Sequence, residues 1–158
     1  MKDESLKELV SRIHQELDEI RHVLARINEG WERARRSNDD YYVDGVALNL
    51  HGFYAGFERI FVRIAEVIDG DLPQGETWHL LLLQQMLDEV PNVRPAVIST
   101  EAGNMLNEYR GFRHIVRNVY TYKLDPSKVG KLVHSAQTTF TKLNAELLAF
   151  ASFLEQGQ

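Results

Sequence analysis

The chain of 158 residues carries a net charge of −5 and no cysteine. A length of this order is typical of a single domain that buries enough apolar surface to fold without a metal or a disulfide, and the missing thiols exclude disulfides, thiolate nucleophiles and thiolate metal sites. The acidic total argues against a protein that coats nucleic acid with its whole surface, but it leaves room for one local basic site.

The chain begins with MKDESLKELV, which is charged and helical in character and unlike a signal peptide. No apolar run anywhere reaches the roughly 18 residues of a membrane-spanning helix. We therefore expect one domain over residues 1–158, located in the cytoplasm and without a membrane partner.

Two long amphipathic helices are predicted first, because apolar residues recur at steps of three and four. The first apolar stripe covers residues 6–31 and the second covers residues 43–68. The polar segment 37–40 separates them.

Three residues of the second predicted helix stand out. Gly52 and Gly56 each cost a helix about 1 kcal/mol relative to alanine, so we expect another backbone to approach closely there. Glu58 follows a strongly apolar face, and we expect it to pair with an arginine of the fourth helix.

A loop over residues 70–75 precedes a short third helix, predicted over residues 78–90 and ended by Pro91. The unbroken leucine run at positions 80–83 predicts burial on several sides. His79, beside Trp78, is expected to have a packing or capping role, with a substrate contact as the alternative.

The fourth helix is predicted to begin after a cap at Ser99 or Thr100, and the fifth after Asp125, with Pro126 at its first position. No strand-like alternation appears. The predicted fold is therefore all-α, an up-and-down bundle of four long helices plus one short helix.

The segment YRGFRHIVRNVYTYKLDP, residues 109–126, is unusually basic for an acidic protein, and it has no acidic residue from 109 to 124. On a helix that continues through this segment, Arg113 and Tyr120 point within about 20° of each other, so we expect a cationic strip with an exposed phenol. Two interpretations remain open. The cations could pair with acids elsewhere and favour the helix dipole, or the arginines could bind phosphate through their fork of donors.

This segment resembles the signature of HEPN-domain proteins of the HepT-like toxin family. The signature is an arginine, a polar residue, a few variable residues, a histidine, one further residue and a tyrosine. Arg113, His114 and Tyr120 fit it, and Asn118 stands at the histidine position. The resemblance covers residues 5–155 in helical outline, but only 109–126 are specific.

The resemblance implies a metal-independent RNA endonuclease, the toxin of a type II HEPN/MNT toxin–antitoxin system, with no cofactor. Arg113 would polarise the scissile phosphate, and Tyr120 would belong to the catalytic set as a substrate contact. Arg110, His114 and Arg117 would hold the RNA backbone. Asn118 forms hydrogen bonds but does not exchange a proton near neutral pH, so we expect an inactive or weakened nuclease.

The resemblance also implies two protein partners. One is a second copy of the chain, and the other is a nucleotidyltransferase antitoxin of the MNT type that attaches AMP to Tyr120. Spacing adds an independent argument, because residues 113 and 118 project about 140° apart on an unbroken helix. Either the helix is kinked there or a second subunit completes the site.

Other functions stay open at this point. Glu19 with His22, and Glu76 with His79, match the Glu-x-x-His pattern of di-metal bundles, but the first pair faces away from the apolar stripe, where ligands of that type must point inward. We therefore predict no metal site. The alternatives to a nuclease are a non-catalytic module that binds RNA or a nucleotidyltransferase, and a structural helical interaction protein.

Overall fold

The computed structural model describes residues 2–156, and these residues form five α-helices with no strand among them, which confirms the all-α bundle. Four helices are long and one is short. The helices are α1 (Lys2–Ser37), α2 (Tyr41–Ile64), α3 (Trp78–Leu87), α4 (Thr100–Asn118) and α5 (Pro126–Gln156).

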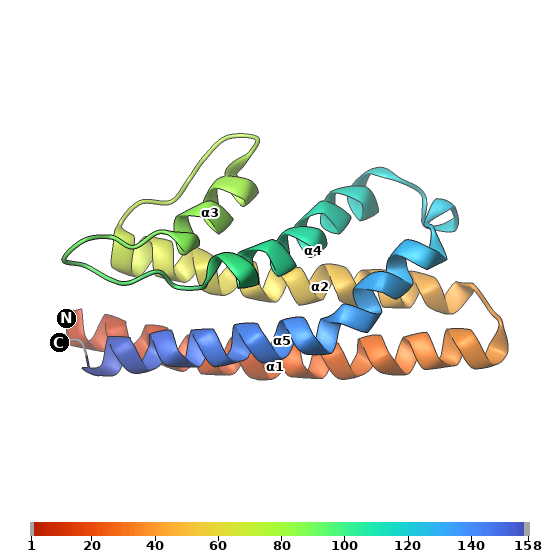
Figure 1. Ribbon diagram of the computed structural model, residues 1–158, viewed down its shortest axis with the longest axis horizontal. Coiled ribbons are helices and arrows are strands. Elements are labelled where there is room, and N and C mark those ends of the chain that lie inside the picture. Colours follow the sequence, from red (N-terminus) through yellow and green to blue (C-terminus); the bar gives the residue numbers. More distant parts are fainter. Residues whose placement is uncertain (1, 157–158) are drawn as a thin grey trace.

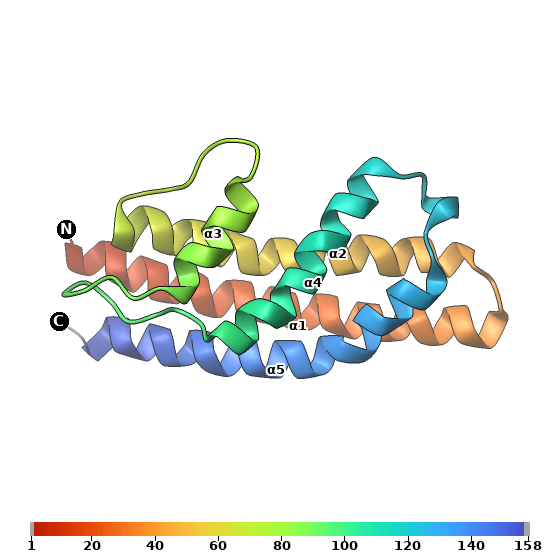
Figure 2. The same cartoon turned by 45° about the horizontal axis from the view of Figure 1, so that its top comes forward.

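The three longest helices, α1, α2 and α5, run side by side along the molecule, and α3 and α4 cover the opposite side of α2 (Figure 1). In the tilted view, α4 crosses α2 obliquely, and the start of α3 and the end of α4 rise on the same side of the bundle (Figure 2). This arrangement gives α2 a central place, in contact with every other helix.

The predicted stripes of α1, α2 and α5 form most of the core, and buried residues of α3 and α4 complete it. Nearly all members of these stripes are buried, and only Val10, Trp31 and Ile68 at the margins are partly exposed. Aromatic rings fill the centre, where Phe53 packs edge-to-face on Phe57 with ring centroids 5.3 Å apart. Burial of these side chains is what fixes the face that each helix turns inward.

The close approach expected at the two glycines of α2 occurs at only one of them. A Cβ atom added to Gly56 would lie 2.5 Å from Cγ1 of Ile20 on α1, whereas one added to Gly52 would meet nothing within 4 Å. The expectation of a neighbouring backbone was wrong, because the partner is a side chain and Gly52 has no partner of either kind.

The predicted second helix reaches Asp69, but its last five residues, Ala65–Asp69, form a π-helical turn. This turn directs Asp69 toward Arg94, whose side chain is fully buried and donates to both carboxylate oxygens at 2.6 and 2.8 Å. Arg94 also donates to the carbonyl oxygens of Gln85, Asp88 and Pro95. The guanidinium thus ties the end of α2 to the end of α3 and to the linker that follows.

The third helix ends at Leu87, three residues before the predicted end, and Asp88 is extended. Burial of the leucine run is narrower than expected. Leu82 and Leu83 are buried, but Leu81 is 42% exposed, because α3 contacts the bundle through one face only.

The predicted caps of the last two helices are confirmed. The hydroxyl of Ser99 accepts a hydrogen bond from the backbone N–H of Ala102 at 3.1 Å and donates to Glu146 of α5. Asp125 accepts from the backbone N–H of Ser127 at 2.9 Å, and Pro126 is the first residue of α5. None of the described helices is both long and apolar enough to cross a membrane.

Replacement of Arg94 tests how much the buried clamp stabilises the fold. Arg94→Met leaves the buried carboxylate of Asp69 without a cation, with the side-chain amide of Gln85 still donating to it at 2.7 Å, and we expect the free energy of unfolding in urea to fall by about 3–5 kcal/mol. Arg33→Met is the matched control, because Arg33 pairs with Glu29 on the surface, where a pair contributes about 0–1 kcal/mol. Equal losses in the two variants would contradict the assignment.

The two glycines of α2 form a second matched pair. Gly56→Ala pushes a methyl group against Ile20, and we expect a loss of about 1–3 kcal/mol in the free energy of unfolding. Gly52→Ala meets open space, and we expect a gain of up to about 1 kcal/mol from the higher helix propensity of alanine. Thermal unfolding followed by circular dichroism measures both, and a stabilised Gly56→Ala protein would show that the contact is not tight.

Candidate functional site

A cleft of about 470 Å³ lies between the start of α3 and the C-terminal half of α4. Helix α3 and the loop before it form one wall, and consecutive turns of α4 form the other. The lining residues are Glu76, Thr77, His79, Leu80, Arg110, Arg113, His114, Arg117 and Asn118.

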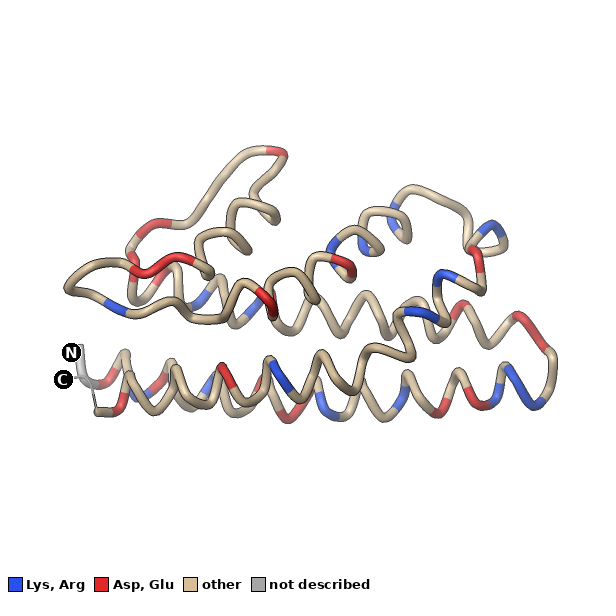
Figure 3. Tube along the Cα trace, viewed as in Figure 1, with Lys and Arg blue, Asp and Glu red and all other residues tan. Residues whose placement is uncertain are grey.

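Three arginines line the α4 wall at spacings of three and four residues, so they follow one side of the helix. None of the salt bridges among the described residues involves Arg110, Arg113 or Arg117. Arg110 donates to the side-chain oxygen of Asn107 at 2.8 Å, which is a neutral partner. The last turns of α4 carry blue and no red (Figure 3), so the α4 wall presents unneutralised positive charge.

A bridge of three side chains from three helices runs into the cleft. Nδ1 of His79 on α3 lies 2.6 Å from Oε2 of Glu58 on α2, and Nε2 of the same ring lies 3.1 Å from Nη1 of Arg113 on α4. Glu58 is buried, and His79 and Arg113 are partly exposed to the cleft. The Glu58–His79–Arg113 bridge therefore connects the interior of the bundle to the arginine row.

The two contacts of the ring define one tautomer of His79. Arg113 has only donors, so Nε2 must accept and carries the lone pair, while Nδ1 carries the proton and donates to Glu58. Trp78 lies beside the imidazole with ring centroids 3.7 Å apart. The carboxylate, the guanidinium and the indole together fix the orientation of the ring.

Glu58 was expected to pair directly with an arginine of α4, and that expectation was wrong. His79 stands between Glu58 and Arg113, and the carboxylate accepts a hydrogen bond from the imidazole. The position of His79 next to a tryptophan at a helix start indicated a packing role, and the ring contact with Trp78 provides it. The bridge itself was missed, because no spacing along the sequence relates residues 58, 79 and 113.

Asn118 is the last residue of α4, and the helix is unbroken up to it. Its side-chain N–H donates to the carbonyl oxygen of His114 at 2.7 Å and lies 3.4 Å from the Nδ1 of the same residue. Both side chains are exposed and line the cleft with Arg113. A single chain without a kink thus brings positions 113 and 118 to one cleft, which the helical projection did not predict.

Tyr120 lies outside the cleft. The helix was expected to continue through it, but Val119 is extended and a short 3₁₀ turn, Thr121–Lys123, follows. Tyr120 is 72% exposed and stacks on Tyr122 with ring centroids 6.0 Å apart. The predicted alignment of Tyr120 with Arg113 was therefore wrong, whereas the phenol is as accessible as expected.

The charge of the arginine row reaches the neighbouring helix. Burial, followed by the positive charges of Arg113 and Arg117, lowers the pKa of His51 on α2, and Glu58 opposes this effect. Burial, followed by the negative charge of Glu58, raises the pKa of Tyr54 on the same helix far above its ordinary value. The uncompensated cations therefore disfavour a further positive charge nearby, as they would favour an anion.

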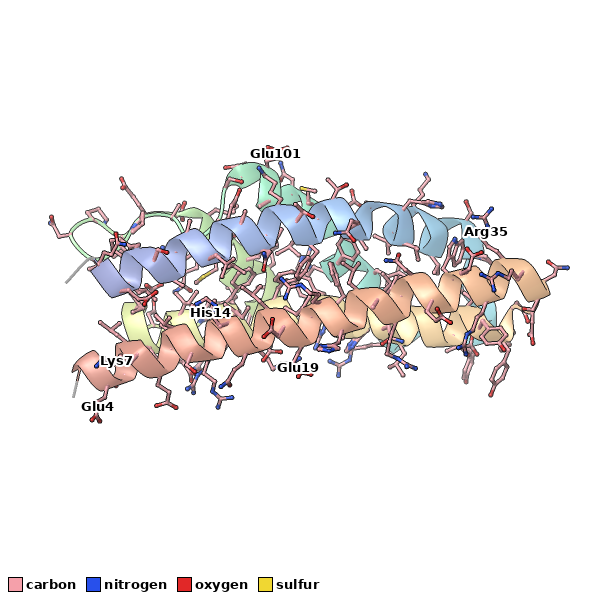
Figure 4. All side chains as sticks on the ribbon, turned by 90° about the horizontal axis from the view of Figure 1, so that it is seen from below. Glu4, Lys7, His14, Glu19, Arg35 and Glu101 are labelled. Atoms are coloured by element: carbon pink, nitrogen blue, oxygen red, sulfur yellow. The ribbon has the colours of Figure 1, made fainter. Side chains whose placement is uncertain are left out.

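The Glu-x-x-His pairs do not converge on a metal site. Glu19 and His22 are exposed on α1, and Glu19 points away from the other helices (Figure 4). Glu76 and His79 both line the cleft, but no group of three potential ligands occurs within residues 2–156.

A family model described as HepT-like protein matches residues 45–154, more than half of the chain. The match includes α3, α4 and every residue of the cleft. No curated protein and no solved structure matches the sequence significantly.

Proposed function

The chain belongs to the HepT-like family, and on this premise we propose that it is a metal-independent RNA endonuclease of the HEPN type, the toxin of a toxin–antitoxin pair. The observation that carries the proposal is the row of three arginines that line one cleft without a salt bridge among the described residues. A row of unpaired guanidiniums suits a chain of phosphates, because each phosphate accepts two parallel hydrogen bonds from arginine.

In this proposal Arg113 binds the scissile phosphate, and its charge stabilises the extra negative charge of the transition state. The bridge through His79 supports this role, because it holds the guanidinium at a defined place in the cleft. Arg110, His114 and Arg117 hold the flanking backbone of the RNA. The exposure of His114 and Arg117 leaves both free to contact a long polymer.

Asn118 slows the reaction in this proposal. An amide donates and accepts hydrogen bonds but does not move a proton, and general acid–base help typically contributes about 10²–10⁴ in rate. The alternative is a non-catalytic module that binds RNA or a nucleotidyltransferase through the same arginines. A purely structural role for these arginines is less well supported, because it requires acidic partners that the described residues do not provide.

We also propose that the chain forms a homodimer and that a nucleotidyltransferase of the MNT type attaches AMP to Tyr120. The phenol oxygen would form a bond to the α-phosphorus of ATP, with pyrophosphate leaving and the phenol proton passing to solvent. The exposure of Tyr120 supports the second proposal, and its place outside the cleft suggests that the added phosphate would act at the rim.

Restoration of a histidine tests the nuclease proposal. We expect Asn118→His to cleave single-stranded RNA about 10²–10⁴ times faster than the parent chain, because the imidazole moves a proton that the amide does not. Gel analysis of labelled RNA under single-turnover conditions measures the rates.

Arg113→Ala in the Asn118→His background is the control, and we expect it to be inactive. If the parent and Asn118→His both bind RNA but neither cleaves it, the chain is a binding module. If neither binds RNA, the nuclease and the RNA-binding module are both wrong, and a module that binds a nucleotidyltransferase is the alternative that is left.

Incubation with an MNT-type transferase and ATP tests the modification. We expect a mass increase of one AMP per chain, located on Tyr120 by peptide mapping, and no increase in Tyr120→Phe. Tyr122→Phe is the matched control, because Tyr122 is similarly exposed and stacks on Tyr120. AMP that persists on Tyr120→Phe would assign the modification to another residue.

A further inference from the structure

We propose that His79 supplies the proton-transferring imidazole that position 118 lacks, as the general base that activates the ribose 2′-hydroxyl. The inference rests on the proposed nuclease function and deepens it. It assigns a catalytic residue on α3, outside the segment that carries the sequence signature.

The carboxylate of Glu58 orients the imidazole of His79. Glu58 is buried and lies 2.6 Å from Nδ1, so it holds the proton on that nitrogen and leaves the lone pair on Nε2. A carboxylate in this position also stabilises the imidazolium that forms when Nε2 takes up a proton. The resting state of His79 is therefore that of a base.

The Nε2 atom of His79 lies beside the arginine row. It lies 3.1 Å from Nη1 of Arg113, and both side chains line the cleft. A phosphate that accepts hydrogen bonds from the guanidinium therefore comes within reach of Nε2. When Arg113 turns its donors to the phosphate, the lone pair of Nε2 is released for the adjacent sugar hydroxyl.

His114, the other imidazole of the cleft, differs from His79 in its contacts. His114 is exposed, and the contact found for its ring is with the amide of Asn118, at 3.4 Å. It has no carboxylate within hydrogen-bond distance among the described residues, so no anion stabilises its charged form. Of the two rings, His79 is the one that is hydrogen-bonded to a buried carboxylate.

The reaction requires no reagent other than water. The 2′-oxygen forms a bond to phosphorus, and its proton passes to Nε2 of His79. The bond from phosphorus to the 5′-oxygen breaks, and the leaving oxygen takes a proton from water. The products are a 2′,3′-cyclic phosphate and a 5′-hydroxyl, and His79 returns its proton to solvent.

A double-mutant cycle between positions 79 and 118 separates a catalytic His79 from one that only positions Arg113. Four proteins are compared: the parent chain, His79→Gln, Asn118→His and the double variant. The measured quantities are the single-turnover rate at saturating single-stranded RNA of mixed sequence, and the Kd for a 2′-deoxy analogue that resists cleavage.

We expect His79→Gln to slow the parent at least about 100-fold. In the Asn118→His background we expect a loss below about tenfold, because the second imidazole takes over the proton. The Kd should change less than about threefold in all four proteins. Such unequal losses are the signature of two residues that serve one step.

Three results would overturn the inference. Equal losses in both backgrounds would make His79 a positioning residue for Arg113. A parent chain that is inactive while Asn118→His cleaves would leave the nuclease function standing and show that His79 moves no proton. Inactivity of all four proteins would refute the nuclease function and this inference with it.

A second variant covers the case in which His79→Gln does not fold. Glu58→Gln keeps an acceptor for the N–H of Nδ1 but removes the negative charge, and we expect it to slow the parent at least about tenfold. It should slow Asn118→His less. Unchanged cleavage by Glu58→Gln in the parent background would argue against activation of His79 by the charge of Glu58.

Discussion

The bridge from Glu58 through His79 to Arg113 is the constraint on which the cleft depends. It joins α2 to both walls of the cleft, because His79 contacts both Glu58 and Arg113. Burial of the Glu58 carboxylate without the imidazole would lower the free energy of unfolding, and the Arg113 guanidinium without the imidazole would be free to turn into solvent. The bridge therefore holds Arg113 beside Nε2 of His79 in the free protein, so that a phosphate bound by this guanidinium comes within reach of the imidazole.

The remainder of the bundle serves to hold the three helices of the bridge in place. α2 is fixed by the interlock of Gly56 with Ile20 and by the aromatic core. α3 is short and contacts the bundle through one face, but Arg94 ties its end to Asp69 and to three carbonyl oxygens. The cap at Ser99 connects the start of α4 to α5. The charged side chains of the cleft are thus carried by helices that are each tied to the bundle.

Much of this structure could be predicted from the sequence, because burial leaves a periodic trace. The apolar stripes, the caps at Ser99 and Asp125 and the acid-free segment of α4 all appeared in the expected places. The end of α4 was missed because no glycine or proline marks it, and with it the position of Tyr120. The roles of His79 and Arg94 depend on contacts between distant helices, which no local spacing encodes.

The π-helical turn at the end of α2 makes one short stretch of the chain tolerant of the loss of a single residue. The wide turn at Ala65–Asp69 accommodates one residue more than an α-helical turn would. Loss of one residue before Asp69 would restore regular α-helical winding, and the carboxylate that meets Arg94 would keep nearly the same direction, because one turn of either helix returns the chain to the same face. Insertion of a further residue would instead rotate that carboxylate by about 100°, so natural length variation within this turn should be limited to the absence of one residue.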